Sequence, residues 1–178
     1  NTSKLDSQQK DVFHNIFEMI DKYNLYGKVA YPKRHSSTQI PSLYRWAASR
    51  GGFFVNPALT EPFGLTLLEA SSCGLPIIST DDGGPKEILS KCNNGLLVDV
   101  NDINKLKGTL EKAIADNSSW KLWSRNGIEG VHRHFSWNTH VCNYLSIISD
   151  LYQTSSLGSS SGIKQSCLKG SSSLIKPH

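Results

Sequence analysis

Apolar residues recur along the chain with two different periods. Near the start, five of them follow one another at steps of three or four residues: Val12, Phe13, Ile16, Phe17 and Ile20. This spacing places their side chains on one face of a helix. We therefore predict an amphipathic helix over residues 7–23.

Further along the chain, short continuous apolar runs alternate with helical patterns. The runs are Val29–Tyr31, Phe53–Val55, Pro76–Ser79 and Leu96–Val98. Helices are expected to begin near Pro41, Gly64, Pro85, Asp102, Ser118 and Ser136. Apolar runs without polar alternation are typical of strands buried on both faces. The pattern predicts an α/β fold, with a Rossmann-like parallel sheet of about four strands and helices on both faces.

The final segment has a different composition from the rest of the chain. Residues 155–178 contain nine Ser and three Gly, with no acidic or aromatic residue. Such a segment has too few apolar groups to form a packed core. We predict a disordered C-terminal tail after a body that spans residues 1–154.

The charge and cysteine content exclude several classes of protein. Three of the four net positive charges come from Lys164, Lys169 and Lys176 in the tail, so the body does not resemble a nucleic-acid-binding surface. No apolar run approaches the ~20 residues that span a bilayer. The four cysteines lack ligand-like spacing, which favours free thiols in a cytoplasmic protein and no metal site. The start at Asn1, without an initiator Met, is interpreted as a cut.

Ligands of open parallel sheets bind beyond the carboxyl ends of the strands, so the loops there are candidate sites. These loops span residues 32–39, 56–63, 80–84 and 99–102. The second and third are rich in Pro and Gly, which fix the backbone direction and allow close approach to a ligand. Asp81 and Asp82 in the third loop are either a metal pair or, as we favour, an acidic turn.

Glu61 and Glu69 are the central polar residues of the predicted site. Glu61 precedes the helix that is expected near Gly64, and Glu69 follows eight residues later. The first amides of that helix would form a positive end suited to phosphate oxygens. Carboxylates repel phosphate but accept hydrogen bonds from sugar and ribose hydroxyls. A nucleotide sugar matches all of these groups.

The segment from Glu61 to Glu69 resembles the E-x7-E motif of retaining glycosyltransferases with the two-Rossmann-domain (GT-B) fold. Further segments in register resemble the sucrose-phosphate synthase family and, slightly less, the sucrose synthases: 56–70, Gly74-Leu-Pro, Gly83-Gly-Pro with Glu87-Ile88, and Asn94-Gly-Leu-Leu-Val-Asp. The resemblance runs from about Leu25 to Tyr152. It implies that residues 1–154 are part of a C-terminal donor-binding domain.

The same resemblance implies a role for each matching residue. Glu61, expected to be the catalytic residue, would contact the hydroxyls of the donor glucose, and Glu69 those of the ribose. Backbone amides of Phe63, Gly64, Leu65 and Thr66 would face the sugar and the diphosphate of UDP-glucose. Pro32 and Lys33 would border the uracil, and Gly83 and Gly84 would shape the cleft wall. No tightly bound cofactor and no metal are expected.

In such enzymes glucose leaves UDP with retained configuration, and the acceptor for sucrose-phosphate formation is fructose 6-phosphate. The acceptor-binding domain and the Arg and Lys that contact the pyrophosphate would precede Asn1. We therefore expect the isolated chain to bind nucleotide weakly and to be inactive in sucrose-phosphate formation. Three alternatives stay open: a sucrose synthase-type reaction with fructose, a glycoside hydrolase with two carboxylates, and a noncatalytic interaction module that retains the fold.

Overall fold

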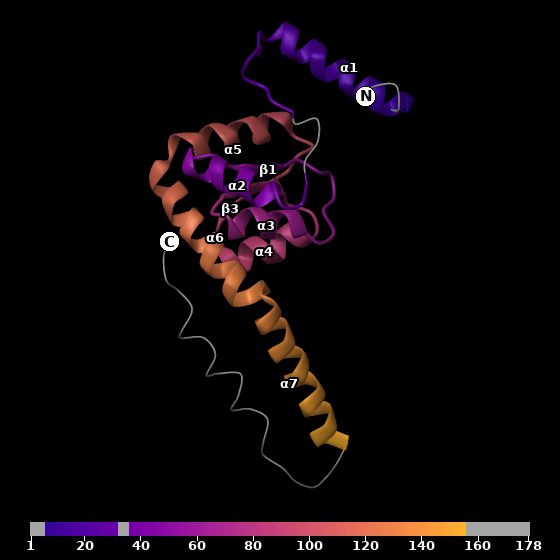
Figure 1. The fold of residues 1–178 in the computed structure, drawn as a ribbon, viewed down its shortest axis with the longest axis vertical. Helices are drawn as coiled ribbons and strands as arrows, with labels where there is room; N and C mark the ends of the chain where they lie inside the picture. The colour runs from indigo at the N-terminus through magenta and orange to yellow at the C-terminus, as the bar shows by residue number, and fades with distance from the viewer. Residues whose placement is uncertain (1–5, 32–35, 156–178) are drawn as a thin grey trace. The chain divides into compact units, whose positions relative to one another are not determined.

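The computed structural model describes residues 6–31 and 36–155. The chain divides into two compact units, residues 1–37 and 38–178 (Figure 1). Of the predicted tail, residues 156–178 lie outside the described residues.

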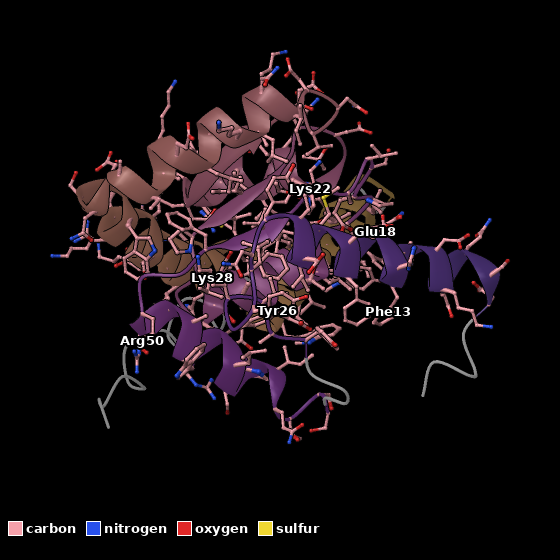
Figure 2. The ribbon with its side chains drawn as sticks, turned by 90° about the horizontal axis from the view of Figure 1, so that it is seen from above. Phe13, Glu18, Lys22, Tyr26, Lys28 and Arg50 are labelled. Atoms are coloured by element: carbon pink, nitrogen blue, oxygen red, sulfur yellow. The ribbon has the colours of Figure 1, made fainter. Side chains whose placement is uncertain are left out.

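The described part of the first unit contains one helix, α1 (Ser7–Lys22), in the place that the apolar spacing predicts. Asp6 caps it by accepting a hydrogen bond from the Gln9 amide at 2.7 Å, and the Gln9 side chain accepts one from the Asp6 amide. This capping box satisfies two of the amides that a helix start leaves without partners. Figure 2 shows Phe13, Glu18 and Lys22 along α1, with Tyr26 and Lys28 in the segment that follows.

The strand predicted at Val29–Tyr31 is wrong. These residues lie within the described part of the chain, where no strand pairs with them, and both Val29 and Tyr31 are exposed. The Tyr31 ring packs edge-on against Phe13 and Phe17, with ring centroids 6.3 and 6.1 Å apart. The apolar character of this run therefore serves a contact with α1 instead of a place in a sheet.

The second unit is built on a parallel sheet whose three strands match the other three predicted runs. The strands are β1 (Phe54–Asn56), β2 (Ile77–Thr80) and β3 (Gly95–Val98), in the order β1-β2-β3. In the central strand, Ile77 lies opposite Phe54 on one side and Gly95 on the other. Every residue of β2 is buried, as expected for a strand covered on both faces.

The described part of the second unit contains six helices. They are α2 (Ile40–Ser49), α3 (Leu65–Ser72), α4 (Gly84–Cys92), α5 (Ile103–Ala115), α6 (Asn117–Phe135) and α7 (Trp137–Ser155). Ile77 packs with Leu67 of α3 and Ile88 of α4 in one cluster, whereas its neighbour Ile78 packs with Ala113 of α5 in another. Adjacent strand residues point to opposite faces, so helices cover both faces of the sheet (Figure 1). The predicted fold class is confirmed.

Two buried glycines let α6 pack closely against its neighbours. A Cβ on Gly130 would lie 2.7 to 2.8 Å from atoms of Cys92, and one on Gly127 would lie 3.3 Å from the Ser71 carbonyl oxygen. Helix α6 can therefore cross α3 and α4 at short range. Within the described residues, none of the helices is both long and apolar enough to cross a membrane.

This packing predicts opposite effects for two Gly→Ala substitutions in helix interiors. Gly130→Ala should destabilise the fold by about 1 to 3 kcal/mol, because overpacking outweighs the better helix propensity of Ala. Gly108→Ala in α5, where an added Cβ meets nothing within 4 Å, should be neutral or stabilising by up to about 1 kcal/mol. Urea unfolding of both variants measures the difference, and equal stabilities would contradict the close crossing.

Candidate functional site

Two helices begin together at the carboxyl edge of the sheet. Strand β1 leads through a loop to α3, and the neighbouring strand β2 leads through a shorter loop to α4 (Figure 1). The two loops touch, since Glu61 and Gly83 form an isolated parallel bridge and the Gly84 amide donates to the Glu61 carbonyl oxygen at 2.8 Å. Both helix N-termini are thereby held at one place, where the sequence predicts the site.

The Glu61 carboxylate is held from two sides. One oxygen, Oε1, accepts a hydrogen bond from the Gly64 amide at 3.0 Å, and the other, Oε2, accepts one from the Asn56 side-chain amide at 3.0 Å. Asn56 is itself fixed, because its Oδ1 accepts a bond from the Ala58 amide. Each carboxylate oxygen has two lone pairs, so Glu61 keeps acceptor capacity for a ligand while its orientation is set.

The surroundings of Glu61 favour its charged form. The hydrogen bond from the Gly64 amide, followed by that from Asn56, lowers the pKa of Glu61 below its ordinary value, while partial burial opposes this shift. Hydrogen bonds to a carboxylate stabilise its ionised state. Glu61 is therefore an anion at neutral pH, suited to accepting hydrogen bonds and unsuited to donating a proton.

Helix α3 begins with amides that have no partner. Gly64 precedes the helix with φ +79°, a left-handed conformation that favours glycine, and a Cβ there would lie 2.7 Å from Ile88 Cδ1. The Gly64 amide binds Glu61 and the Leu67 amide binds the Gly64 carbonyl oxygen. Within the described residues, the amides of Leu65 and Thr66 have no hydrogen-bond acceptor. They are available to an anionic ligand.

Gly83 and Gly84 allow the second loop to approach the first. A Cβ on Gly83 would collide with the Glu61 carbonyl group, and a Cβ on Gly84 would collide with that of Phe63. Because neither glycine carries a Cβ, the backbones of the two loops can lie in direct contact. Phe63, between Glu61 and Gly64, leaves 78% of its surface exposed.

Glu69 lies on the exposed side of α3, one helical turn after Leu65. The opposite side of this helix is buried through Leu67, Ala70 and Ser71. Within the described residues the Glu69 carboxylate has no hydrogen-bond or ion-pair partner. Its charge does reach Tyr44, whose pKa is raised mainly by burial and secondarily by Glu69.

The Glu61 carboxylate is thus hydrogen-bonded within the protein, whereas the Glu69 carboxylate has no partner among the described residues. Of the other predicted site residues, Gly64, Gly83 and Gly84 contact Glu61 directly. Phe63 lies against Gly84, and Leu65 and Thr66 begin α3 directly after Gly64. Pro32 and Lys33 lie outside the described residues. A hollow of about 630 Å³ lies beside the same edge of the sheet, near α5, and none of the predicted site residues lines it.

Two contacts of the site did not follow from the sequence analysis. Asn56 binds Glu61, and Thr60 donates a hydrogen bond to Asp82 at 2.8 Å across the two loops. The position of Asn56 at the carboxyl end of a predicted strand could have indicated its contact with Glu61. Among the described residues, no three His, Cys, Asp or Glu side chains gather as metal ligands, and Asp82 Oδ2 accepts the hydrogen bond from Thr60.

Residues 9–130 match the family described as "Glycosyl transferases group 1". The chain is similar to sucrose-phosphate synthase 4 of Arabidopsis thaliana, with 50% identity over 135 residues that cover 76% of this chain and 13% of that protein. It is also similar to the sucrose-phosphate synthase of Spinacia oleracea, with 46% identity, covering 82% of this chain and 14% of that one. The chain thus spans about one seventh to one eighth of the length of these relatives.

Solved structures share the fold. A sucrose-phosphate synthase from Thermosynechococcus elongatus aligns with a TM-score of 0.65 and 28% identity, covering 84% of this chain and 37% of that one. An Anabaena protein solved in complex with UDP aligns with a TM-score of 0.66 and 19% identity, covering 84% of this chain and 38% of that one. The second likeness concerns the fold alone.

The environment of Glu61 predicts how stability depends on pH. Because folding lowers the pKa of Glu61, its stabilising contribution is complete above the ordinary value of 4.5 and is lost as pH falls through the lower folded value. The stability difference between the wild type and Glu61→Gln should therefore shrink between about pH 5 and pH 3. Urea unfolding across this range measures it, with Glu111→Gln on α5 as background. A difference that stays constant or grows would contradict the hydrogen-bonded carboxylate.

Proposed function

The chain belongs to the group 1 glycosyltransferases, and from this premise we propose that residues 1–154 are the donor-binding part of an enzyme of the sucrose-phosphate synthase type. The donor is UDP-glucose, and the complete enzyme transfers glucose to fructose 6-phosphate with retention. The observation that carries this proposal is the unpartnered pair of amides, Leu65 and Thr66, at a helix start that is fixed by Glu61.

The diphosphate is assigned to the start of α3. Its oxygens would accept hydrogen bonds from the Leu65 and Thr66 amides, and the helix dipole adds a favourable interaction with negative charge. The start of α4 lies against the same loop through the bond between Gly84 and Glu61, so a second helix dipole faces this region.

The sugar and the ribose are assigned to the two carboxylates. Glu61 accepts hydroxyl hydrogen bonds from the donor glucose with the lone pairs that Gly64 and Asn56 leave free. Glu69, whose carboxylate is unoccupied, accepts those of the ribose.

Glu61 acts by position. Its carboxylate is held by two N–H donors, which reduces its nucleophilicity and fixes its orientation. Transfer with retention then proceeds on one face of the sugar, where the leaving phosphate takes the proton of the acceptor hydroxyl as the new glycosidic bond forms. Contacts to the glucose hydroxyls keep the reacting carbon aligned with the acceptor.

The acceptor is assigned to a part of the polypeptide that this chain does not contain. The relatives are about seven to eight times as long as the matched region, and a domain that binds the acceptor belongs to the remainder. We place the enzyme in the cytoplasm and assign it no tightly bound cofactor.

This division predicts that the isolated chain binds UDP without forming sucrose 6-phosphate. Incubation of the purified chain with UDP-glucose and fructose 6-phosphate should give no product by mass spectrometry, because the proposal assigns the acceptor site to another part of the enzyme. Product formation above the level of heat-treated protein would contradict the proposed division.

The donor site itself is tested by binding of UDP. Glu69→Ala should weaken UDP binding by roughly 10- to 100-fold, the loss expected for hydrogen bonds to a charged group. The fold should be unaffected, because Glu69 has no structural partner in the described residues. Isothermal titration calorimetry measures the affinity, with Glu111→Ala as an exposed acidic control. Equal affinities of the wild type and Glu69→Ala would overturn the ribose assignment.

A further inference from the structure

We propose that the hydrogen bond between Thr60 and Asp82 is a clamp that fixes the two loops of the site and so sets where the amides of α3 and α4 stand relative to the donor diphosphate. Thr60 and Asp82 are then positioning residues, and this inference rests on the proposed donor site. Neither residue is expected to touch the donor.

The clamp joins parts of the chain that are far apart in sequence. The Thr60 hydroxyl donates to Asp82 Oδ2 at 2.8 Å across 22 residues. The backbone of Asp82 is also held, because its amide donates a hydrogen bond to the hydroxyl of Thr80, the buried last residue of β2. The contact therefore ties the first loop to the central strand of the sheet.

A second link lies directly beside the first. Glu61, the neighbour of Thr60, accepts a backbone hydrogen bond from Gly84, two residues after Asp82. The bridge between Glu61 and Gly83 aligns the two backbones at one point, and the side-chain bond beside it restrains how far the loops can turn about that point. The clamp thereby controls the backbone that carries both the Glu61 carboxylate and the N-terminus of α4.

The chemistry of the clamp suits positioning more than stability. A hydroxyl bound to a carboxylate is a short and strong hydrogen bond, but this one is exposed, so water competes for both groups and the net gain for folding is small. Its effect on ligand binding is larger, because hydrogen bonds from the α3 amides to the diphosphate weaken steeply when their distance and angle are displaced. Loss of the clamp should therefore change binding while leaving the fold intact.

The clamp also explains the adjacent acids that the sequence analysis singled out. Asp82 turns to Thr60, whereas Asp81 lines the hollow beside α5. The two carboxylates serve different surroundings and do not converge on a shared ion.

The first test uses UDP titration of this chain with matched variants. Thr60→Val, which keeps the shape and removes the hydroxyl, should weaken UDP binding roughly tenfold, and Asp82→Ala should do the same. The double variant should be no weaker than either single variant, because both changes remove one interaction. Thr60→Ser and Asp82→Asn, which keep a donor and an acceptor, should bind within about threefold of the wild type. Wild-type affinity of Thr60→Val, or additive effects in the double variant, would overturn the proposal.

The second test needs no ligand and separates the clamp from the proposed function. Hydrogen exchange of the Gly84 amide should be several-fold faster in Thr60→Val and Asp82→Ala, with unchanged urea unfolding, because the neighbouring bond to Glu61 opens more often. Unchanged exchange would refute the clamp. If wild-type chain binds no UDP, the proposed function fails, whereas exchange still decides whether Thr60 and Asp82 hold the loops.

Discussion

The hydrogen bonds of the Glu61 carboxylate connect the sheet, the loop after β1 and the start of α3. Through Asn56 the carboxylate is attached to the end of β1, and through the Gly64 amide it is attached to the first turn of the helix. Glu61 also meets α4 through its carbonyl oxygen, which binds the Gly84 amide. One residue thus determines where two helix N-termini begin, and the amides that follow depend on it for their direction.

This arrangement gives the two acidic residues of the site different properties. Glu61 spends part of its acceptor capacity on the protein and gains a fixed orientation, with a pKa that its N–H donors lower. Glu69 is exposed on the outer side of α3 and has no partner in the described residues, so it can adapt to a ligand. The same pair of residue types, eight positions apart, therefore supplies one rigid and one adjustable acceptor. In the proposed assignment, the rigid acceptor faces the reacting sugar and the adjustable one faces the ribose.

The sequence predicts the parts of the structure that rest on local pattern. The three runs around Val55, Ile78 and Leu97 form strands because they are apolar on both faces. Helix α3 begins after Gly64, where the left-handed φ of +79° favours glycine. Val29–Tyr31 has the same composition, yet a strand also needs a neighbour, and pattern alone does not supply one. The match over residues 9–130 confirms the family resemblance. That resemblance was the basis for predicting which residues form the site. The bonds from Asn56 to Glu61 and from Thr60 to Asp82 were missed, because they depend on how side chains of separate loops meet.

We propose that an anionic ligand occupies the free amides at the start of α3, and amide NMR can observe this occupancy residue by residue. On titration of ¹⁵N-labelled chain with UDP, the largest amide shifts should fall at Leu65 and Thr66, with smaller shifts at Gly64 and Gly84. The amides of Gly108 and Glu111 on α5 should stay in place. Saturable shifts that leave the Leu65 and Thr66 amides unmoved, or that centre on the hollow beside α5, would show that the ligand does not bind at the start of α3.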